Sequence, residues 1–283
     1  MRPGGLAHPP VLGLVSALDR DHPQGTPAMS SIHAVAVVPA RYDSQRFPGK
    51  VLADIGGDPL IQWVYERAAR ARRVDRAFVA TDSEKVEAAC RAFTTDVWLS
   101  QAPHASGTDR VAEIAREVEA NIFVNVQTDE PMMDPDLVDA LIDLMDGEGV
   151  DFASAVAPIH EMTDFLDPNV VKVVCDARGD ALYFSRAPIP WPRGERLEPD
   201  APWPPGLRAL KHIGIYAYRR EALLELAALP RSEAEVAESL EQLRVLDRGW
   251  RMRILEWDYK GIGVDTESDL ERIRNYIKHQ WSK

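Results

Sequence analysis

Four residues that suit a phosphate-binding site lie within ten positions of one another: Arg41, Ser44, Arg46 and Lys50. They follow a run of mostly β-branched apolar residues at 35–39, which predicts a short buried strand. Arginine offers a planar fork to phosphate oxygens, and lysine supplies a compact charge. Because ligands of open α/β sheets bind beyond the carboxyl ends of the strands, we interpret this loop as a candidate polyphosphate site.

The alternative is a solvated basic loop, since most charge clusters lie at the surface. The loop is not a Walker A loop, because no G-x-x-x-x-G-K-[ST] motif is present and Val51 follows Lys50. The whole chain of 283 residues has a formal net charge of −12, so the positive charge of this loop is opposite in sign to that of the protein as a whole. The acidic excess argues against a general binder of nucleic acids or of anionic membranes.

Two acidic residues are candidates for a metal site. Asp129 follows the apolar run 122–126, a predicted strand, and Asp265 lies in a turn before the last predicted helix. Carboxylate oxygens are ligands of Mg²⁺, which also keeps waters and binds phosphate oxygens. Either residue could instead cap a helix or belong to a loop. The sequence does not show whether the two carboxylates converge.

The elements that must position these residues alternate between strand and helix in the first half of the chain. Strands are predicted at 35–39, 77–80, 97–99 and 122–126, and helices at 61–72, 84–93, from about 111 to 118, and from 135 to about 145. Asp58 is the expected N-cap of the first helix. This alternation predicts βαβ units and a mainly parallel sheet.

The pattern changes after residue 150. Strands are predicted at 152–156, 170–175, 181–186, 213–218 and 251–256, with a hairpin loop at 176–180, and helices at 221–229, 235–246 and 267–279. We therefore predict an α/β, Rossmann-like, mostly parallel sheet in residues 31–283, with an inserted β-rich region at about 151–218. Residues 1–30 are rich in Pro and Gly and are expected to be a disordered extension or a misassigned start.

From residue 34 to about 276 the sequence resembles the cytidylyltransferases that activate acidic sugars, in particular the 3-deoxy-manno-octulosonate (KDO) cytidylyltransferase family. The matching blocks lie at 39–42, 48–50, 80–82, 106–108, 125–127, 129–131, 183–187, 189–191, 212–216, 240–244 and 263–266. So many blocks in the same order make the resemblance specific. It implies the nucleotide-diphospho-sugar transferase type of fold and transfer of CMP from CTP to the anomeric hydroxyl of KDO, with release of diphosphate.

The resemblance also implies a role for each candidate residue. Arg41, Lys50 and Asp129 would be catalytic; Arg41, Ser44, Arg46, Lys50, Ser106 and Gly107 would bind the nucleotide; Gln127, Arg186, His212, Tyr216, Glu241 and Gln242 would bind the acidic sugar; and Asp129 and Asp265 would hold Mg²⁺. It implies a homodimer with the β-rich region at its interface. Cys90 and Cys175 have no metal-like spacing, and we expect reduced thiols in a cytoplasmic protein. Neither nucleic acid nor membrane is expected as a partner.

Thr128 departs from the family pattern, which usually has glycine before the metal-binding aspartate. This departure leaves open an amino-substituted KDO, another ulosonic acid or a phosphonate as the acceptor. We expect Thr128 to affect the choice of acceptor more than the affinity for CTP. Two plainer interpretations remain, because Glu241 and Arg244 have the i,i+3 spacing of a helical ion pair and Tyr216 could simply pack. A non-catalytic nucleotide-binding regulator is the alternative class of function, although such a protein need not keep both metal-site acids.

Overall fold

Strand β1 (Ala34–Ala40) lies inside a sheet whose strands run in the order β11-β7-β10-β6-β1-β4-β5. The other strands of this path are β4 (Arg76–Thr81), β5 (Val97–Leu99), β6 (Ile122–Val126), β7 (Phe152–Ile159), β10 (Ala209–Arg219) and β11 (Met252–Glu256). β10 runs antiparallel to both of its neighbours, β6 and β7, and the remaining pairs along the path are parallel. The sheet is therefore mostly parallel, as the sequence predicts. This computed structural model describes residues 33–43, 47–101, 104 and 106–281.

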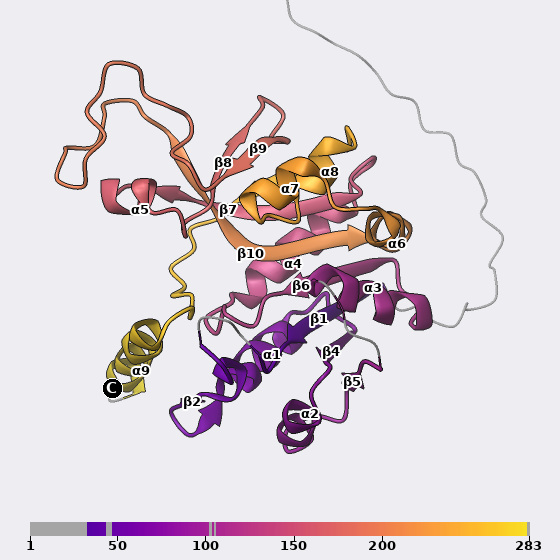
Figure 1. The fold of residues 1–283 in the computed structure, drawn as a ribbon. Helices are drawn as coiled ribbons and strands as arrows, with labels where there is room; N and C mark the ends of the chain where they lie inside the picture. The colour runs from indigo at the N-terminus through magenta and orange to yellow at the C-terminus, as the bar shows by residue number, and fades with distance from the viewer. Residues whose placement is uncertain (1–32, 44–46, 102–103, 105, 282–283) are drawn as a thin grey trace, which may run out of the picture. The chain divides into compact units, whose positions relative to one another are not determined.

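Helices cover both faces of the sheet. Successive side chains of each buried strand therefore pack against opposite helical layers. Ala36 and Val38 of β1 pack in a core with α1 (Leu60–Arg70), α4 (Pro135–Met145) and α9 (Glu267–Trp281). Val35 and Val37 pack in a second core with α3 (Gly107–Glu117) and α6 (Arg220–Ala228). Helix α2 (Glu84–Cys90) follows β4 (Figure 1). No helix within the described residues is long and apolar enough to cross a membrane.

A smaller group of elements extends from the first half of β10. There β8 (Lys172–Cys175) pairs with β10 and with β9 (Ala181–Ser185), and the predicted loop at 176–180 connects the hairpin. The short helix α5 (Met162–Leu166) packs in a separate apolar cluster with Trp203 of the long loop before β10. Of the predicted insertion at 151–218, β7 and the second half of β10 lie in the central sheet.

The last helix returns to the elements that follow β1. After β11 an extended segment passes along the molecule to α9, which lies beside the short strand β2 (Asp54–Ile55) (Figure 1). Strand β2 pairs with β3 (Asp58–Pro59). The guanidinium of Arg274 in α9 donates a hydrogen bond to the carbonyl oxygen of Asp54 at 2.9 Å. This return places the segment before α9 next to η1 (Lys50–Leu52), the short helical turn that closes the cationic loop.

The predicted helix at 235–246 is wrong, because two short helices occupy this stretch. They are α7 (Glu233–Glu238) and α8 (Leu243–Asp247), separated at Ser239, whose φ of 53° is left-handed and ends the first helix. The predicted cap of α1 is also wrong, since Asp58 belongs to β3 and Pro59 is the N-cap, without a side-chain bond. Helix α3 begins earlier than predicted because Ser106 forms a capping box.

The break between α7 and α8 is held by a buried ion pair. Both oxygens of the Glu235 carboxylate accept hydrogen bonds from the guanidinium of Arg244, at 2.6 and 2.7 Å, and the two residues are 0% and 6% exposed. Arg244 is thus paired with Glu235 rather than with Glu241, contrary to the i,i+3 interpretation. Without Arg244, the buried Glu235 carboxylate would keep only the largely exposed Arg231 as a charged partner, at 3.1 Å, and breaking a buried pair in this way is destabilising.

We therefore expect Arg244→Met to lower the free energy of unfolding by about 3–5 kcal/mol, measured by urea denaturation. The double variant Glu235→Gln/Arg244→Met also removes the charge of the buried carboxylate, which would otherwise keep only Arg231 as its charged partner, and should recover part of that loss. A loss below about 1 kcal/mol in the single variant would show that the pair does not secure this turn.

Candidate active site

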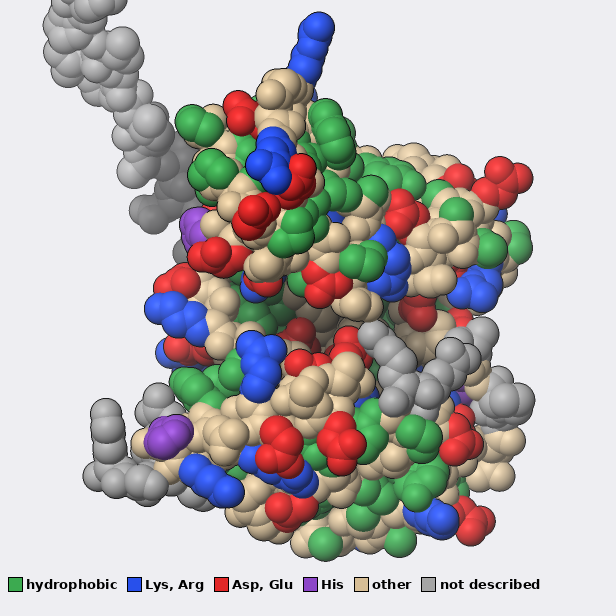
Figure 2. Space-filling model, turned by 60° about the vertical axis from the view of Figure 1, so that its left-hand side comes forward, with side chains coloured by type: hydrophobic (Ala, Val, Ile, Leu, Met, Phe, Trp, Pro, Cys, Tyr) green, Lys and Arg blue, Asp and Glu red, His purple; other side chains and the backbone are tan. Residues whose placement is uncertain are grey.

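A pocket with a volume of about 550 Å³ opens beyond the carboxyl ends of β1 and β6. Its walls come from the loop after β1, the turn after β6, the face of β10, the turn between α7 and α8, and the segment before α9. Figure 2 shows this face of the molecule hollowed across its middle, with acidic and basic side chains around the hollow. Elements from both halves of the chain therefore build a single site.

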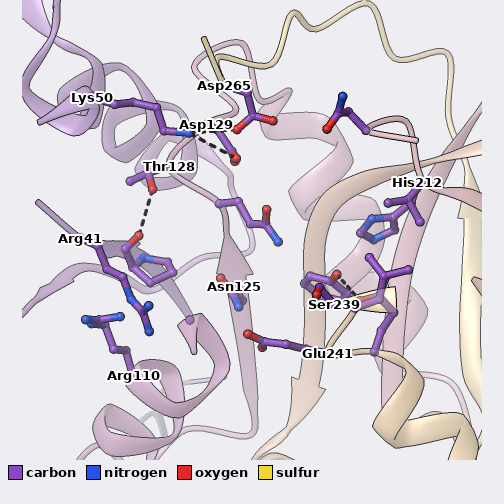
Figure 3. A pocket seen from close by; sticks show the side chains of 18 of the residues that line it. Arg41, Lys50, Arg110, Asn125, Thr128, Asp129, His212, Ser239, Glu241 and Asp265 are labelled. Atoms are coloured by element: carbon purple, nitrogen blue, oxygen red, sulfur yellow. Dashed lines mark hydrogen bonds and ion pairs between the residues drawn. The ribbon is translucent and has the colours of Figure 1, made fainter. Parts of the chain in front are cut away.

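Lys50 is the centre of one wall. Its ammonium group lies 2.8 Å from the carbonyl oxygen of Val264, 3.3 Å from the carboxylate of Asp265 and 3.7 Å from that of Asp129. Lys50 is only 8% exposed, and Figure 3 shows all three charged side chains at the same side of the pocket. The two candidate acids, 136 positions apart in the sequence, thus converge on one cation.

The surroundings of Asp129 are crowded with negative charge. Glu130, the next residue, accepts a hydrogen bond from the Tyr259 hydroxyl at 2.6 Å. Burial, followed by the neighbouring charge of Asp129, raises the pKa of Glu130 to about 7. The sequence left open whether Asp265 caps the last helix. It does not, because Thr266 and Asp269 exchange the capping hydrogen bonds at the start of α9. Its carboxylate faces Lys50 instead.

The cationic loop is placed beside this cluster. Arg41 lines the pocket and donates a hydrogen bond to the carbonyl oxygen of His104 at 2.6 Å. Ser44 and Arg46 lie outside the described residues. Gly49, at the N-terminus of η1, has a φ of 74°, a left-handed conformation that glycine adopts without a steric penalty.

Ser106 and Gly107 have different positions. The Ser106 side chain accepts a hydrogen bond from the backbone N–H of Asp109 as part of the capping box. Ser106 is not among the residues that line the pocket. Gly107 does line the pocket, and a Cβ atom there would lie 3.3 Å from the ring of Pro39. The absence of a side chain at Gly107 therefore lets the start of α3 lie close to Pro39.

Strand β10 forms the opposite wall. His212 and Tyr216 lie on the same face of β10, with ring centroids 5.1 Å apart, and the Tyr216 hydroxyl donates to the Gln242 side chain at 3.1 Å. Tyr216 is therefore part of the pocket surface as well as packed. Burial lowers the pKa of His212 to about 3, so its ring is neutral at ordinary pH and is unsuited to act as a general base.

The remaining predicted sugar residues also line the pocket. Glu241 accepts a hydrogen bond from the Thr108 hydroxyl at 2.6 Å, which connects the turn before α8 to α3. Arg186 donates to the backbone carbonyls of Glu238 and Pro168, at 2.7 and 2.9 Å. The backbone N–H of Gln127 donates to the Gly214 carbonyl at 3.2 Å. The six residues predicted to bind the sugar therefore all line one cavity: Gln127, Arg186, His212, Tyr216, Glu241 and Gln242.

Three buried polar side chains of the wall have atoms without a hydrogen-bond partner among the described residues. They are Nε and Nη1 of Arg110, Oδ1 of Asn125 and Nε2 of Gln242. Such atoms are costly to bury unless a ligand or water satisfies them. Arg110 and Asn125 were not among the site residues predicted from the sequence. Asn125 had a signal, since it is the one polar residue of β6, whereas nothing marked Arg110 as buried.

Thr128 bridges the ends of two strands. The pairing of β1 with β6 stops at Val37 and Asn125, whereas β1 stays paired with β4 as far as Ala40. Across this opening the Thr128 hydroxyl donates a hydrogen bond to the Pro39 carbonyl at 3.0 Å (Figure 3). The hydroxyl is thus turned toward the strand that leads to Arg41.

The donor set of this site fits a magnesium ion. It offers two carboxylates on a pocket wall, and no group of three or more His, Cys, Asp or Glu side chains suited to a metal occurs in the part of the chain that the structure describes. Mg²⁺ is typically bound by one or two carboxylates together with waters and substrate phosphates. Asp129 and Asp265 would hold the ion, and phosphate oxygens would complete its coordination.

The chain is similar to known cytidylyltransferases. The family model described as cytidylyltransferase matches residues 35–254. A 3-deoxy-manno-octulosonate cytidylyltransferase of Geobacter metallireducens is 48% identical over 241 residues, covering 84% of this chain and 95% of the relative. The corresponding protein of Geobacter sulfurreducens is 46% identical and is covered completely, by 87% of this chain.

Solved structures give the same result. CMP:2-keto-3-deoxy-manno-octonic acid synthetase complexed with CTP has a TM-score of 0.80 and 44% identity, covering 88% of this chain and 99% of that one. A 4-diphosphocytidyl-2C-methyl-D-erythritol synthase of Anaerococcus prevotii shares the fold, with a TM-score of 0.55 and 10% identity. The resemblance found in the sequence blocks is confirmed. The chain is a nucleotidyltransferase that belongs to the cytidylyltransferases and, within them, to the 3-deoxy-manno-octulosonate cytidylyltransferase family.

Proposed function

We propose that the protein transfers CMP from CTP to the anomeric hydroxyl of KDO and releases diphosphate. The observation that carries this proposal is the convergence of Asp129 and Asp265 on Lys50, opposite a polar wall of β10, in a member of this family. One wall suits a metal–triphosphate and the other a polyhydroxylated acid. A regulator without activity would not need both carboxylates in this arrangement.

In the reaction, the anomeric oxygen attacks the α-phosphorus, the bond from that phosphorus to the bridging oxygen breaks with departure of diphosphate, and the hydroxyl proton passes to water. Lys50 and Arg41 would bind phosphate oxygens and stabilise the charge on the departing diphosphate. Bound Mg²⁺ supplies Lewis-acid stabilisation of phosphate charge. His212 is neutral and would bind the sugar rather than accept the proton.

The other polar side chains would orient the two substrates. The unpaired N–H groups of Arg110 fit acceptor atoms of the nucleotide, on the side where Gly107 lets the chain approach closely. Gln127, Arg186, Tyr216, Glu241 and Gln242 would contact the acidic sugar. A site whose buried donors and acceptors match one ligand rejects analogues that leave them unpaired.

The experiment that tests this function is diphosphate release with CTP and a panel of acceptors: KDO, its amino-substituted analogue, another ulosonic acid and a phosphonate. We expect turnover with KDO and CTP, and much slower turnover when ATP or GTP replaces CTP. Release with a different acid alone would assign the same chemistry to a variant acceptor. No release with any acceptor, from folded protein supplied with Mg²⁺, would overturn the proposal.

We also propose a cytoplasmic homodimer. Leu182 and Tyr183 of β9 and Trp191 in the following loop are 61%, 39% and 66% exposed, which is unusual for large apolar side chains that lie close together in the sequence. Cys90 and Cys175 are free thiols, in keeping with a reducing compartment.

If these apolar side chains form the dimer interface, Leu182→Asp/Trp191→Asp should shift the mass measured by light scattering from dimer to monomer. Val236→Asp, a matched change of an exposed apolar residue on α7, is the control and should leave the mass unchanged. A wild-type monomer, or a double variant that stays dimeric, would contradict this interface.

Asp129→Asn and Asp265→Asn should each lower kcat about 100-fold or more, because each removes one of the two carboxylates proposed to hold Mg²⁺ while keeping the side-chain shape. Diphosphate release at low Mg²⁺ measures the effect, and circular dichroism checks the fold. Asp258→Asn removes the same charge from an exposed site outside the pocket and is the control. Near-normal turnover in either pocket variant would remove that residue from the metal site.

Thr128→Val should raise the KM for CTP about 2- to 12-fold, the worth of one hydrogen bond, because it removes the hydroxyl that donates to the Pro39 carbonyl but keeps the shape. Thr128→Ser retains the hydroxyl and should remain close to wild type. Steady-state kinetics with KDO and its amino analogue measures both substrates. A changed acceptor ratio with an unchanged KM for CTP would instead support the acceptor-side effect expected from the sequence.

A further inference from the structure

A buried serine lies directly behind the sugar-side wall of the pocket. Ser154 of β7 is 0% exposed, and its hydroxyl oxygen lies 2.8 Å from two atoms: the carbonyl oxygen of Ile215 and Nε2 of His212. Ser154 does not line the pocket, whereas His212 does. Its contacts therefore reach a substrate only through the histidine.

An irregularity in the strand pairing creates this arrangement. Ile213 of β10 pairs with Ala155 of β7, but the next pair along β10 is Tyr216 with Ser154, so two residues of β10 are inserted at this point. Such bulges re-aim side chains and interrupt the ladder. The inserted stretch carries Ile215, whose carbonyl is satisfied by the Ser154 hydroxyl instead of by β7 backbone.

The two contacts of Ser154 determine the protonation of His212. A serine hydroxyl has one hydrogen, and a carbonyl oxygen can only accept, so that hydrogen points to Ile215. The contact with Nε2 must then be a hydrogen bond from the imidazole N–H to the serine oxygen. A neutral imidazole has a single N–H, so Nδ1 keeps its lone pair. The burial that lowers the pKa of His212 supports the neutral ring.

Nδ1 is available to the pocket. It has no hydrogen-bond partner among the described residues, while the ring is held in place by Phe184, at a centroid distance of 5.6 Å, and by Tyr216. Figure 3 shows the His212 ring on the wall opposite Lys50 and Arg41, facing the cavity. A ligand in this half of the pocket would therefore meet a hydrogen-bond acceptor.

We infer that Ser154 is a positioning residue that fixes His212 as the Nε2–H tautomer, so that Nδ1 accepts a hydrogen bond from a hydroxyl or amine of the acceptor sugar. The inference deepens the proposed function and rests on it for the identity of the ligand. It assigns a donor group of the sugar to this position and excludes the sugar's carboxylate, which has no hydrogen to donate.

The tautomer can be measured directly by ¹⁵N NMR of the imidazole, with His212→Gln identifying the signals. In the full-length wild type we expect Nε2 at the shift of a protonated nitrogen and Nδ1 at that of an unprotonated one, and KDO binding should move the Nδ1 signal. In Ser154→Ala the preference for Nε2–H should be lost. Wild-type His212 protonated at Nδ1 would overturn the inference, whether or not any variant folds.

Kinetics supply the second measurement. Ser154→Ala should raise the KM for the acceptor sugar about 2- to 12-fold, as expected for one hydrogen bond, with the KM for CTP unchanged, and Ser154→Thr should restore it because the hydroxyl is retained. Equal changes in both KM values, or no change, would reduce Ser154 to a packing residue. Because the tautomer is measured without substrate, failure of KDO turnover in the wild type would overturn the proposed function while leaving the tautomer result to stand.

Discussion

The buried ammonium of Lys50 is the interaction on which the site depends. Asp129, Glu130 and Asp265 bring three carboxyl groups to the same edge of the sheet, where burial, followed by the charge of Asp129, raises the pKa of Glu130. Lys50 lies between two of these acids and also takes the Val264 carbonyl, so one cation joins the loop after β1, the turn after β6 and the segment before α9. The positive charge of Lys50, which would bind phosphate, is thus already paired with two carboxylates of the protein itself.

The fold supplies the two walls by two different departures from a regular sheet. On the nucleotide side, β1 and β6 separate beyond Val37 and Asn125, which opens the crevice expected where neighbouring strands diverge. On the sugar side, β10 runs antiparallel to its neighbours and contains an inserted stretch that presents His212 and Tyr216 to the cavity. The nucleotide wall therefore depends on the ends of strands, and the sugar wall on the face of one strand.

The sequence predicted the elements with strong periodicity and the residues that lie in short blocks, including the cationic loop and the turn with Asp129. It could not show that Asp265 meets Lys50, since 215 positions separate them and the contact depends on the return of the chain to α9. The helix predicted at 235–246 failed because helical periodicity does not report the left-handed residue Ser239. Arg110 and Ser154 could not be predicted, because their interest depends on their burial and on the residues they contact, which the sequence pattern does not show.

We propose that Asp129 and Asp265 together hold a cation, and that the Lys50 ammonium pairs with both carboxylates when no metal–nucleotide is bound. The most direct measurement is the melting temperature of the wild type and Lys50→Met with and without Mg²⁺, at matched ionic strength and without nucleotide. Because the ammonium and the ion would compete for the same carboxylates, Mg²⁺ should raise the melting temperature of Lys50→Met more than that of the wild type. Equal shifts in the two proteins would contradict the account.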